Sequence, residues 1–246
     1  MSPDAVTRIA RAYPERVEVR GRDLTSDLMG RLTFTEYFHL LVTGEEPTEE
    51  QRFFLDLLLV AIAEHGLMPT NVAARMTLAA DPRSLHGAVA AGILGAGPVV
   101  LGTAEECARL LGSDEDPRRL VQRLHAAGEK VPGFGHPVHR PVDPRAERIL
   151  ELAHEHGVSG RHVARARELR DAVADTLTKP VTMNVSMPLA AVLLDLGFRA
   201  DVVKAVPILA RTASLLAHLA EEREQPIGPL LARAAEQAAS YEPPAR

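Results

Sequence analysis

The residues best suited to chemistry lie in a glycine-rich segment, residues 131–137, and shortly after it. Gly133 and Gly135 lack a Cβ atom, so the backbone can adopt positive φ and a ligand can approach main-chain N–H groups. His136 follows directly, and Arg145 comes nine residues later in the first turn of an expected helix. An imidazole and a guanidinium converging on one cavity suit a carboxylate or carbonyl ligand. The spacing is equally compatible with a helix connection that carries a surface histidine.

A metal site is a weaker interpretation of the same segment. His136 and His139 are three residues apart, but Pro137 prevents a regular helical pair and no carboxylate lies within the turn. The single cysteine, Cys107, can form neither an intrachain disulfide nor a multi-cysteine metal cage. We therefore expect no metal, and the cysteine content fits a reducing cytoplasm.

Two other segments interrupt the expected helices and are candidates for the same site. Residues 64–69 contain His65, and residues 178–186 contain Asn184 and Ser186. Functional side chains often lie on loops that a rigid scaffold positions. We expect a site assembled from all three segments.

The elements that position these loops are predicted to be helices. Apolar residues recur at intervals of three and four in residues 53–61, 189–196 and 202–216. Helix starts are signalled by capping residues, namely Thr33 with Glu36, Thr48 with Gln51, Thr103 with Glu106, Asp116-Pro117 and Asp143-Pro144. Only residues 16–20 alternate with period two, which predicts one short strand of an N-terminal hairpin. The sequence predicts an all-α fold with about ten helices and no internal repeat.

Composition restricts the class of partner. The chain has 246 residues, 46% of them hydrophobic, which predicts one or two domains with a sizeable core. Its net charge of −5 and the absence of Trp argue against nucleic-acid binding. The start lacks the pattern of a signal peptide, and the longest apolar stretches, 53–63 and 88–96, are shorter than the roughly 18 residues of a membrane span. We expect buried helices there and a cytoplasmic protein with a small-molecule partner.

Four ordered motifs give the chain a resemblance to a known family. They are LTFTE at 32–36 with LLVTGEEPT at 40–48, GFGHPV at 133–138 with DPRA at 143–146, KP at 179–180 with NV at 184–185, and RTA at 211–213 with AHL at 217–219 and EE at 221–222. On these motifs the chain resembles the citrate synthase superfamily, most closely its short citryl-CoA lyase-like branch, which includes the lyase module of ATP-citrate lyase. The resemblance runs from about residue 17 to residue 241.

The resemblance implies a fold and an assembly. A large helical domain would comprise residues 1–103 and 186–246, and a smaller helical domain residues 104–185, with the site in the cleft between them. A homodimer is also implied, since family members bury long helices against a two-fold partner.

The resemblance further implies a site for a small dicarboxylate beside a CoA thioester, with CoA as substrate and no other cofactor. His65 matches a residue that contacts the acid, and His136 matches the one that polarises or protonates the carbonyl at the reacting carbon. Arg145 and Arg211 match arginines that hold carboxylates. The remaining residues expected at the site are Gly133, Gly135, Asn184 and Ser186, the last two on the thioester side.

Three departures from the family pattern bear on activity. Ser186 stands where the family has its catalytic aspartate, and a serine does not accept a proton at neutral pH without a base of its own. A second family histidine falls at Val100 or Leu101; His86 is a weak substitute because it should lie about one helix too early. Arg233 is the only evident basic residue for a C-terminal segment that enters the partner's site.

The leading prediction is therefore an enzyme that makes or breaks a C–C bond between an acyl-CoA and a 2-oxo dicarboxylate, such as citryl-CoA cleavage to acetyl-CoA and oxaloacetate, weakened by the serine. The alternative is a non-catalytic homologue that binds a carboxylate or CoA ester as a regulatory or partner subunit. A different condensation on the same fold is a third possibility.

Overall fold

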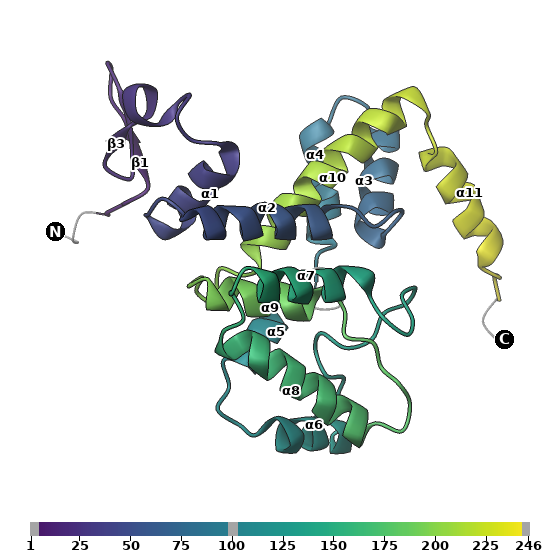
Figure 1. Cartoon of the computed structure of the whole chain (residues 1–246). Coiled ribbons are helices and arrows are strands. Elements are labelled where there is room, and N and C mark those ends of the chain that lie inside the picture. The colour runs from purple at the N-terminus through teal and green to yellow at the C-terminus, as the bar shows by residue number, and fades with distance from the viewer. Residues whose placement is uncertain (1–4, 98–102, 243–246) are drawn as a thin grey trace.

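Eleven α-helices, one short π-helix and a small antiparallel sheet make up residues 5–97 and 103–242, the part of the chain that this computed structural model describes (Figure 1). The sheet has the order β1-β2-β3. Its strands and the π-helix are β1 Ala10–Ala12, β2 Val17–Val19, β3 Arg22–Asp23 and η1 Leu24–Leu28. The α-helices are α1 Phe34–Thr43, α2 Glu49–Ala63, α3 Pro69–Ala80, α4 Leu85–Leu94, α5 Thr103–Leu111, α6 Pro117–Ala126, α7 Pro144–Glu155, α8 Arg161–Thr176, α9 Ser186–Asp195, α10 Ala205–Glu224 and α11 Gly228–Ala238. The all-α prediction and the predicted N-terminal strand are both confirmed.

Local capping fixes where several helices begin. At α1 the Thr33 hydroxyl accepts from the Glu36 N–H at 3.3 Å, and the Glu36 carboxylate accepts from the Thr33 N–H at 2.7 Å. Thr48 and Gln51 form the same reciprocal box at α2. The side chains of Asp116 and Asp143 cap α6 and α7, each before a proline. Such a cap is worth about 1 kcal/mol, so these starts are set by sequence-local interactions.

The helices form two groups that meet along α2 and α9 (Figure 1). In the upper group α10 packs against α2, α3 and α4, and in the lower group α9 packs against α5, α7 and α8. A large apolar core runs from α2 through the lower group, and a smaller one lies between α3, α4 and α10. The sequence-based division places α9 in the larger domain, whereas α9 packs mainly on helices assigned to the smaller one; the division itself stays a prediction.

The two apolar stretches are buried on one face only. Phe54 and Leu58 of α2 are fully buried, while Val60 on the same helix is 79% exposed. In α4 only Ala88 and Gly92 are buried, and Leu94 is 87% exposed. Among residues 5–97 and 103–242, none of the helices combines the length and the apolarity needed to cross a bilayer.

The start of α8 is capped by a side chain from another helix. Gly160 at its N-terminus has no side chain, and Asp195 at the end of α9 accepts from the N–H groups of His162 and Val163, each at 3.0 Å. Asp195 also pairs with Nδ1 of the largely buried His162 at 2.7 Å. A Cβ at Gly160 would lie 2.6 Å from the Asp195 carboxyl carbon, so glycine leaves room for this contact. Asp195 is therefore a structural carboxylate joining α8 to α9.

We predict that Asp195→Ala lowers the free energy of unfolding by about 1–2 kcal/mol, because α8 loses its cap and His162 its partner. Urea unfolding followed by circular dichroism measures this. Asp201→Ala is the control, since Asp201 is exposed and forms a surface ion pair with Arg199. Equal effects of the two substitutions would contradict this role of Asp195.

Candidate active site

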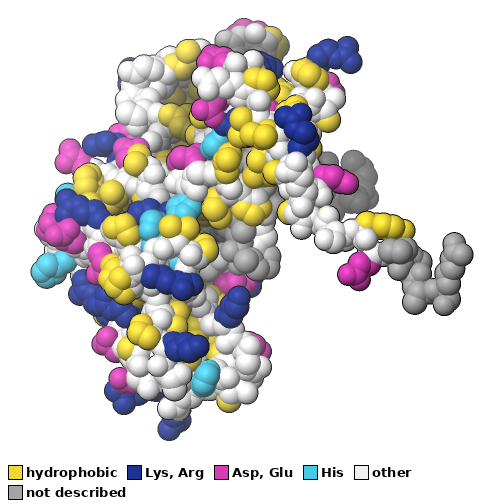
Figure 2. All heavy atoms as spheres, turned by 90° about the vertical axis from the view of Figure 1, so that its right-hand side faces the viewer, with side chains coloured by type: hydrophobic (Ala, Val, Ile, Leu, Met, Phe, Trp, Pro, Cys, Tyr) yellow, Lys and Arg dark blue, Asp and Glu magenta, His cyan; other side chains and the backbone are white. Residues whose placement is uncertain are grey.

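Seven of the sequence-predicted site residues line one cavity of about 350 Å³. Its walls come from the end of α2 and the loop after it, the start of α5, the loop before α7, the start of α7, the start of α9 and the first half of α10. The predicted residues in this lining are His65, Gly135, His136, Arg145, Asn184, Ser186 and Arg211. In the face shown in Figure 2, histidine side chains gather near the middle, with basic side chains below them. The structure brings together side chains that lie up to 146 residues apart in the sequence.

Two loops pair along their backbones to form the floor of this cavity. The Gly135 N–H donates to the Thr182 carbonyl at 2.7 Å, and the Asn184 N–H donates to the Gly133 carbonyl at 2.8 Å. Both glycines have positive φ, +81° at Gly133 and +95° at Gly135, which favours glycine there. The Asn184 amide donates to the Gly135 carbonyl and accepts from the Ser186 N–H. Asn184 thus lines the cavity with its amide already engaged in holding the loops.

Gly133 lies beneath the cavity wall rather than in its lining. A Cβ there would lie 2.8 Å from Sγ of Cys107 and 2.9 Å from Cβ of Met187. Burial, helped by the nearby Glu106, raises the pKa of the Cys107 thiol far above its ordinary value. Cys107 is therefore a packing residue and not a nucleophile.

The surrounding backbone fixes which nitrogen of His136 carries the proton. Nδ1 accepts from the N–H groups of Val138 and His139, at 3.1 and 2.8 Å, so the proton of the neutral ring lies on Nε2. Burial, reinforced by the adjacent His139, lowers the pKa of His136 below its ordinary value. His136 is therefore a neutral N–H donor near pH 7.

Arg145 presents a second donor beside the first. Its Nε and Nη2 bind the two carboxylate oxygens of Asp143 at 3.0 and 2.9 Å, and Nη2 lies 3.4 Å from Nε2 of His136. Because Nη2 of Arg145 and the protonated Nε2 of His136 are both donors, they form no hydrogen bond with each other. An oxygen acceptor placed between them would receive both hydrogen bonds.

Asp143 is fully buried and holds three pieces of the site at once. Besides the Arg145 guanidinium, it accepts from the Arg145 N–H as the cap of α7 and from the Val185 N–H at 3.1 Å. Burial alone would raise the pKa of Asp143, but the hydrogen bonds and charge of Arg145, with the Val185 N–H, outweigh it and hold that pKa below its ordinary value.

Arg211 brings a second guanidinium to the cavity from α10. The residue is 3% exposed; Nη1 donates to the Asn71 side chain at 3.1 Å, while Nε is buried and without a partner. Burial, with a contribution from Arg145, lowers the pKa of Arg211, and Glu64 opposes this. As a cationic side chain in the cavity lining, Arg211 suits an anionic ligand.

Sequence reasoning did not single out Glu64, which anchors the loop carrying His65. Its Oε1 accepts from the N–H groups of His65 and Gly66, and its Oε2 accepts from Ser214 and from Nε2 of His218 on α10. Burial would raise the pKa of Glu64, but these hydrogen bonds lower it to about 2. Adjacency to His65 was the only signal, because the α10 partners lie 150 or more residues away.

His139, considered from sequence only as a metal ligand, contacts the same site. Its Nε2 lies 3.3 Å from Nε2 of His65. Ring nitrogens of His65, His136 and His139 all lie within 4.8 Å of one another, the spacing of a possible metal site. Two features oppose a divalent cation there, namely the backbone donors on Nδ1 of His136 and the guanidinium beside its Nε2. The arrangement fits an anion better, and the expected lack of a metal stays a prediction.

Two other predicted residues, His86 and Arg233, do not line this cavity. His86 is exposed in the first turn of α4, and Arg233 is exposed on α11; neither is in the lining. Val100 and Leu101, where the second family histidine would fall, lie outside the described residues. The roles of His86 and Arg233 remain predictions.

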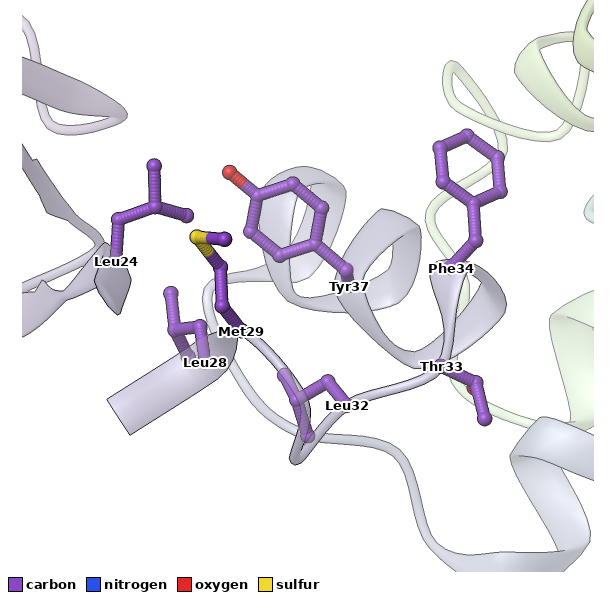
Figure 3. A pocket seen from close by; sticks show the side chains of 7 residues that line it. All are labelled: Leu24, Leu28, Met29, Leu32, Thr33, Phe34 and Tyr37. Atoms are coloured by element: carbon purple, nitrogen blue, oxygen red, sulfur yellow. The ribbon is translucent and has the colours of Figure 1, made fainter. Parts of the chain in front are cut away.

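A separate apolar pocket of about 170 Å³ lies between η1 and α1 (Figure 3). Leu24, Leu28, Met29 and Leu32 project toward it, with Tyr37 from α1. No charged side chain lines it, so it does not suit an acidic metabolite.

Comparison with known proteins shows the family of the chain. The family model for the citrate synthase C-terminal domain matches residues 5–233, so the chain belongs to the citrate synthase family. The citrate synthase of Synechocystis sp. is 31% identical over 201 residues, 78% of this chain and 50% of that protein. The citrate synthase of Haloferax volcanii is 30% identical over 195 residues, 76% of this chain and 51% of that protein. The chain spans about half the length of the curated relatives it matches.

Solved structures show the same architecture over nearly the whole chain. Citryl-CoA lyase from Hydrogenobacter thermophilus superimposes with a TM-score of 0.87 at 28% identity, covering 99% of this chain and 97% of that one. ATP citrate lyase from Methanothrix soehngenii, solved with citrate and coenzyme A, gives a TM-score of 0.83 at 20% identity, covering all of this chain and 42% of that one; this likeness is one of fold. The resemblance inferred from the four motifs is confirmed.

We predict that Asp143→Asn lowers the free energy of unfolding by roughly 3 kcal/mol at pH 7, because the half-buried Arg145 guanidinium loses its charged partner. The folded pKa of Asp143 lies below the ordinary value of 3.8, so the ion pair stabilises at neutral pH and is lost as pH falls below about 4. Urea unfolding of both proteins at pH 7 and pH 3 should show the deficit shrinking at low pH. Asp175→Asn, which alters an exposed pair with Arg118, should show no such deficit; a pH-independent deficit in Asp143→Asn would contradict the ion-pair explanation.

Proposed function

We propose that this protein makes or breaks a C–C bond between an acyl-CoA and a 2-oxo dicarboxylate, with citryl-CoA, acetyl-CoA and oxaloacetate as the representative set. The observation that carries the proposal is the convergence on one cavity of two donors, Nε2–H of His136 and Nη2–H of Arg145, with the cationic side chain of Arg211. A dicarboxylate with a carbonyl or hydroxyl oxygen supplies acceptors for all three.

A second cavity supports placing the CoA ester next to the acid. This cavity of about 620 Å³ shares Gly135 and His136 with the first, and Arg140 and Lys179 also line it. Two exposed cationic side chains suit the phosphates of CoA. An ester entering from this side would bring its thioester carbon to His136.

The chemistry follows from this placement. In cleavage, the hydroxyl proton of the tertiary alcohol is lost, the adjacent C–C bond breaks to leave a ketone, and the electron pair moves to the thioester α-carbon, which takes up a proton. The products are acetyl-CoA and oxaloacetate, and no water or oxidant is consumed. His136 and Arg145 would stabilise the charge that develops on the oxygen in either direction.

Ser186 limits the rate in this proposal. It lines the cavity at the start of α9, where a carboxylate would exchange a proton with the thioester α-carbon. A general base contributes roughly 10²–10⁴-fold, so a site that lacks it binds its ligands and turns over slowly. The same residue favours the second candidate function, a homologue that binds a carboxylate or CoA ester without turnover as a regulatory or partner subunit.

We also propose that the protein acts as a cytoplasmic homodimer, without nucleic acid or membrane partners. Support for the dimer comes from large apolar side chains left exposed on helices, among them Val60 and Leu94.

Purified protein should release acetyl-CoA and oxaloacetate from citryl-CoA, or form citryl-CoA from them, and His136→Ala should lower kcat at least about 10²-fold because the oxygen loses its neutral donor. His125→Ala, an exposed histidine of α6, is the matched control. Turnover that survives His136→Ala would remove His136 from the mechanism. Malate binding seen by thermal shift without any turnover would favour the non-catalytic function.

We predict that Ser186→Asp raises turnover by about 10²-fold or more, because it restores a carboxylate beside the thioester and at a helix N-terminus that tolerates negative charge. Steady-state kcat is the readout, and Ser240→Asp, at an exposed position near the C-terminus, is the control for added charge. An unchanged rate would contradict the placement of Ser186 at the reacting carbon.

A further inference from the structure

His139 contacts both imidazoles of the candidate site, although neither the predicted site residues nor the cavity lining includes it. Its backbone N–H donates to Nδ1 of His136 at 2.8 Å. Its side-chain Nε2 lies 3.3 Å from Nε2 of His65, from a loop 74 residues earlier. The three rings form a cluster with centroids 4.4 to 5.1 Å from His136 and 5.3 Å between His65 and His139.

The number of protons shared by the His65–His139 pair determines how many more it can accept. Two ring nitrogens at 3.3 Å hold one proton between them, so one ring donates from Nε2 and the other accepts. The donating ring, when neutral, has a lone pair on its Nδ1. A further proton can bind at that nitrogen, which makes the pair cationic and turns the bridge into a charge-assisted hydrogen bond. The pair is therefore a one-proton acceptor at the edge of the cavity.

Burial and the nearby charges favour the neutral form of His65. Burial first, and then Arg145 and His139, lower the pKa of His65 below its ordinary value of 6.5, and Asp143 opposes this only in part. Among the described residues, the charged and titratable groups near the pair are His136 in the loop of His139, Asp143 and Arg145 at α7, Glu64 next to His65, and Arg211 in the same cavity lining; Arg140 follows His139 in the chain. Asp143 and Glu64 are already hydrogen-bonded to Arg145 and to α10, respectively.

We propose that the His65–His139 pair takes up one proton when a dicarboxylate binds, with His139 as the positioning residue that lets His65 meet the anion as part of a cationic pair. A dianion reverses the electrostatic environment that favours the neutral rings, so protonation and binding favour each other. This inference rests on the proposed function, because it requires an anion in the cavity.

The thermodynamic linkage between proton uptake and malate binding gives the direction and size of the pH dependence of affinity. Binding raises the pKa of the pair, so affinity is highest below the pKa of the bound state and falls as pH rises through it. Uptake of one proton changes the affinity by about tenfold per pH unit within the window between the free and bound values. The carboxyl groups of malate stay ionised above pH 6.5 and do not contribute to this slope.

The test is calorimetric titration of the full chain with malate, in PIPES and in Tris at pH 7, because buffers of different ionisation enthalpy count the protons taken up. The wild type should take up about 0.5–1 proton per malate and bind several-fold more tightly at pH 6.5 than at pH 7.5. EDTA is present throughout, so that protons displaced by metal ions do not contribute.

Two variants separate the titrating role from packing. His139→Gln keeps a hydrogen-bonding side chain beside His65 and the backbone N–H to His136 but removes one of the two titratable rings, so it should bind malate with less than about half of the wild-type proton uptake and a flatter pH profile. His139→Leu removes the hydrogen-bonding side chain as well and should bind more weakly at every pH. His125→Gln on α6 is the matched control and should behave as the wild type.

The outcomes distinguish this inference from the function it rests on. Malate binding without proton uptake by the wild type, or uptake unchanged in His139→Gln, would overturn the role of the pair and leave the proposed function standing. No malate binding by the wild type would overturn both.

Discussion

The site depends on one buried carboxylate, that of Asp143. Asp143 is fully buried, and both of its carboxylate oxygens accept hydrogen bonds from the Arg145 guanidinium. It also caps α7, the helix on which Arg145 lies, and accepts a hydrogen bond from the Val185 N–H just before α9. A buried charge must be fully hydrogen-bonded to be tolerated, and these partners come from two segments 40 residues apart. The hydrogen bonds that this buried carboxylate needs therefore bring the start of α7 and the start of α9 together. This is where His136 and Ser186 face the same cavity.

The electrostatics of the cavity follow from where the two carboxylates point. Asp143 binds Arg145, and Glu64 turns toward backbone N–H groups and α10, so both acids act as supports outside the reacting space. The groups that face inward are donors, from His136, Arg145 and Arg211. Such donors are held in place before any ligand arrives, which is how a preorganised site favours an oxygen that gains negative charge.

How much of this could be predicted depended on whether the signal was local in the chain. Thr33, Thr48 and Asp143 predicted helix starts because a cap and its helix are adjacent in the sequence. The glycine-rich loop likewise predicted His136, which directly follows it. Contacts between distant segments gave no such signal. The pairing of His139 with His65, the anchoring of Glu64 on α10 and the capping of α8 by Asp195 each join residues 30 or more positions apart. The amide of Asn184 was expected to face substrate, and only the paired loops show that it is already occupied.

The packing beneath Gly133 has a practical consequence. The sole sulfhydryl of the chain lies under that glycine, held protonated and out of reach of solvent, so it cannot form a mixed disulfide with oxidised CoA or react with a thiol-specific dye while the fold is intact. Colour released by such a dye therefore counts free CoA alone, without background from the native polypeptide. If the packing around Gly133 loosens and exposes Cys107, the same dye reacts with that single thiol and so reports the local opening.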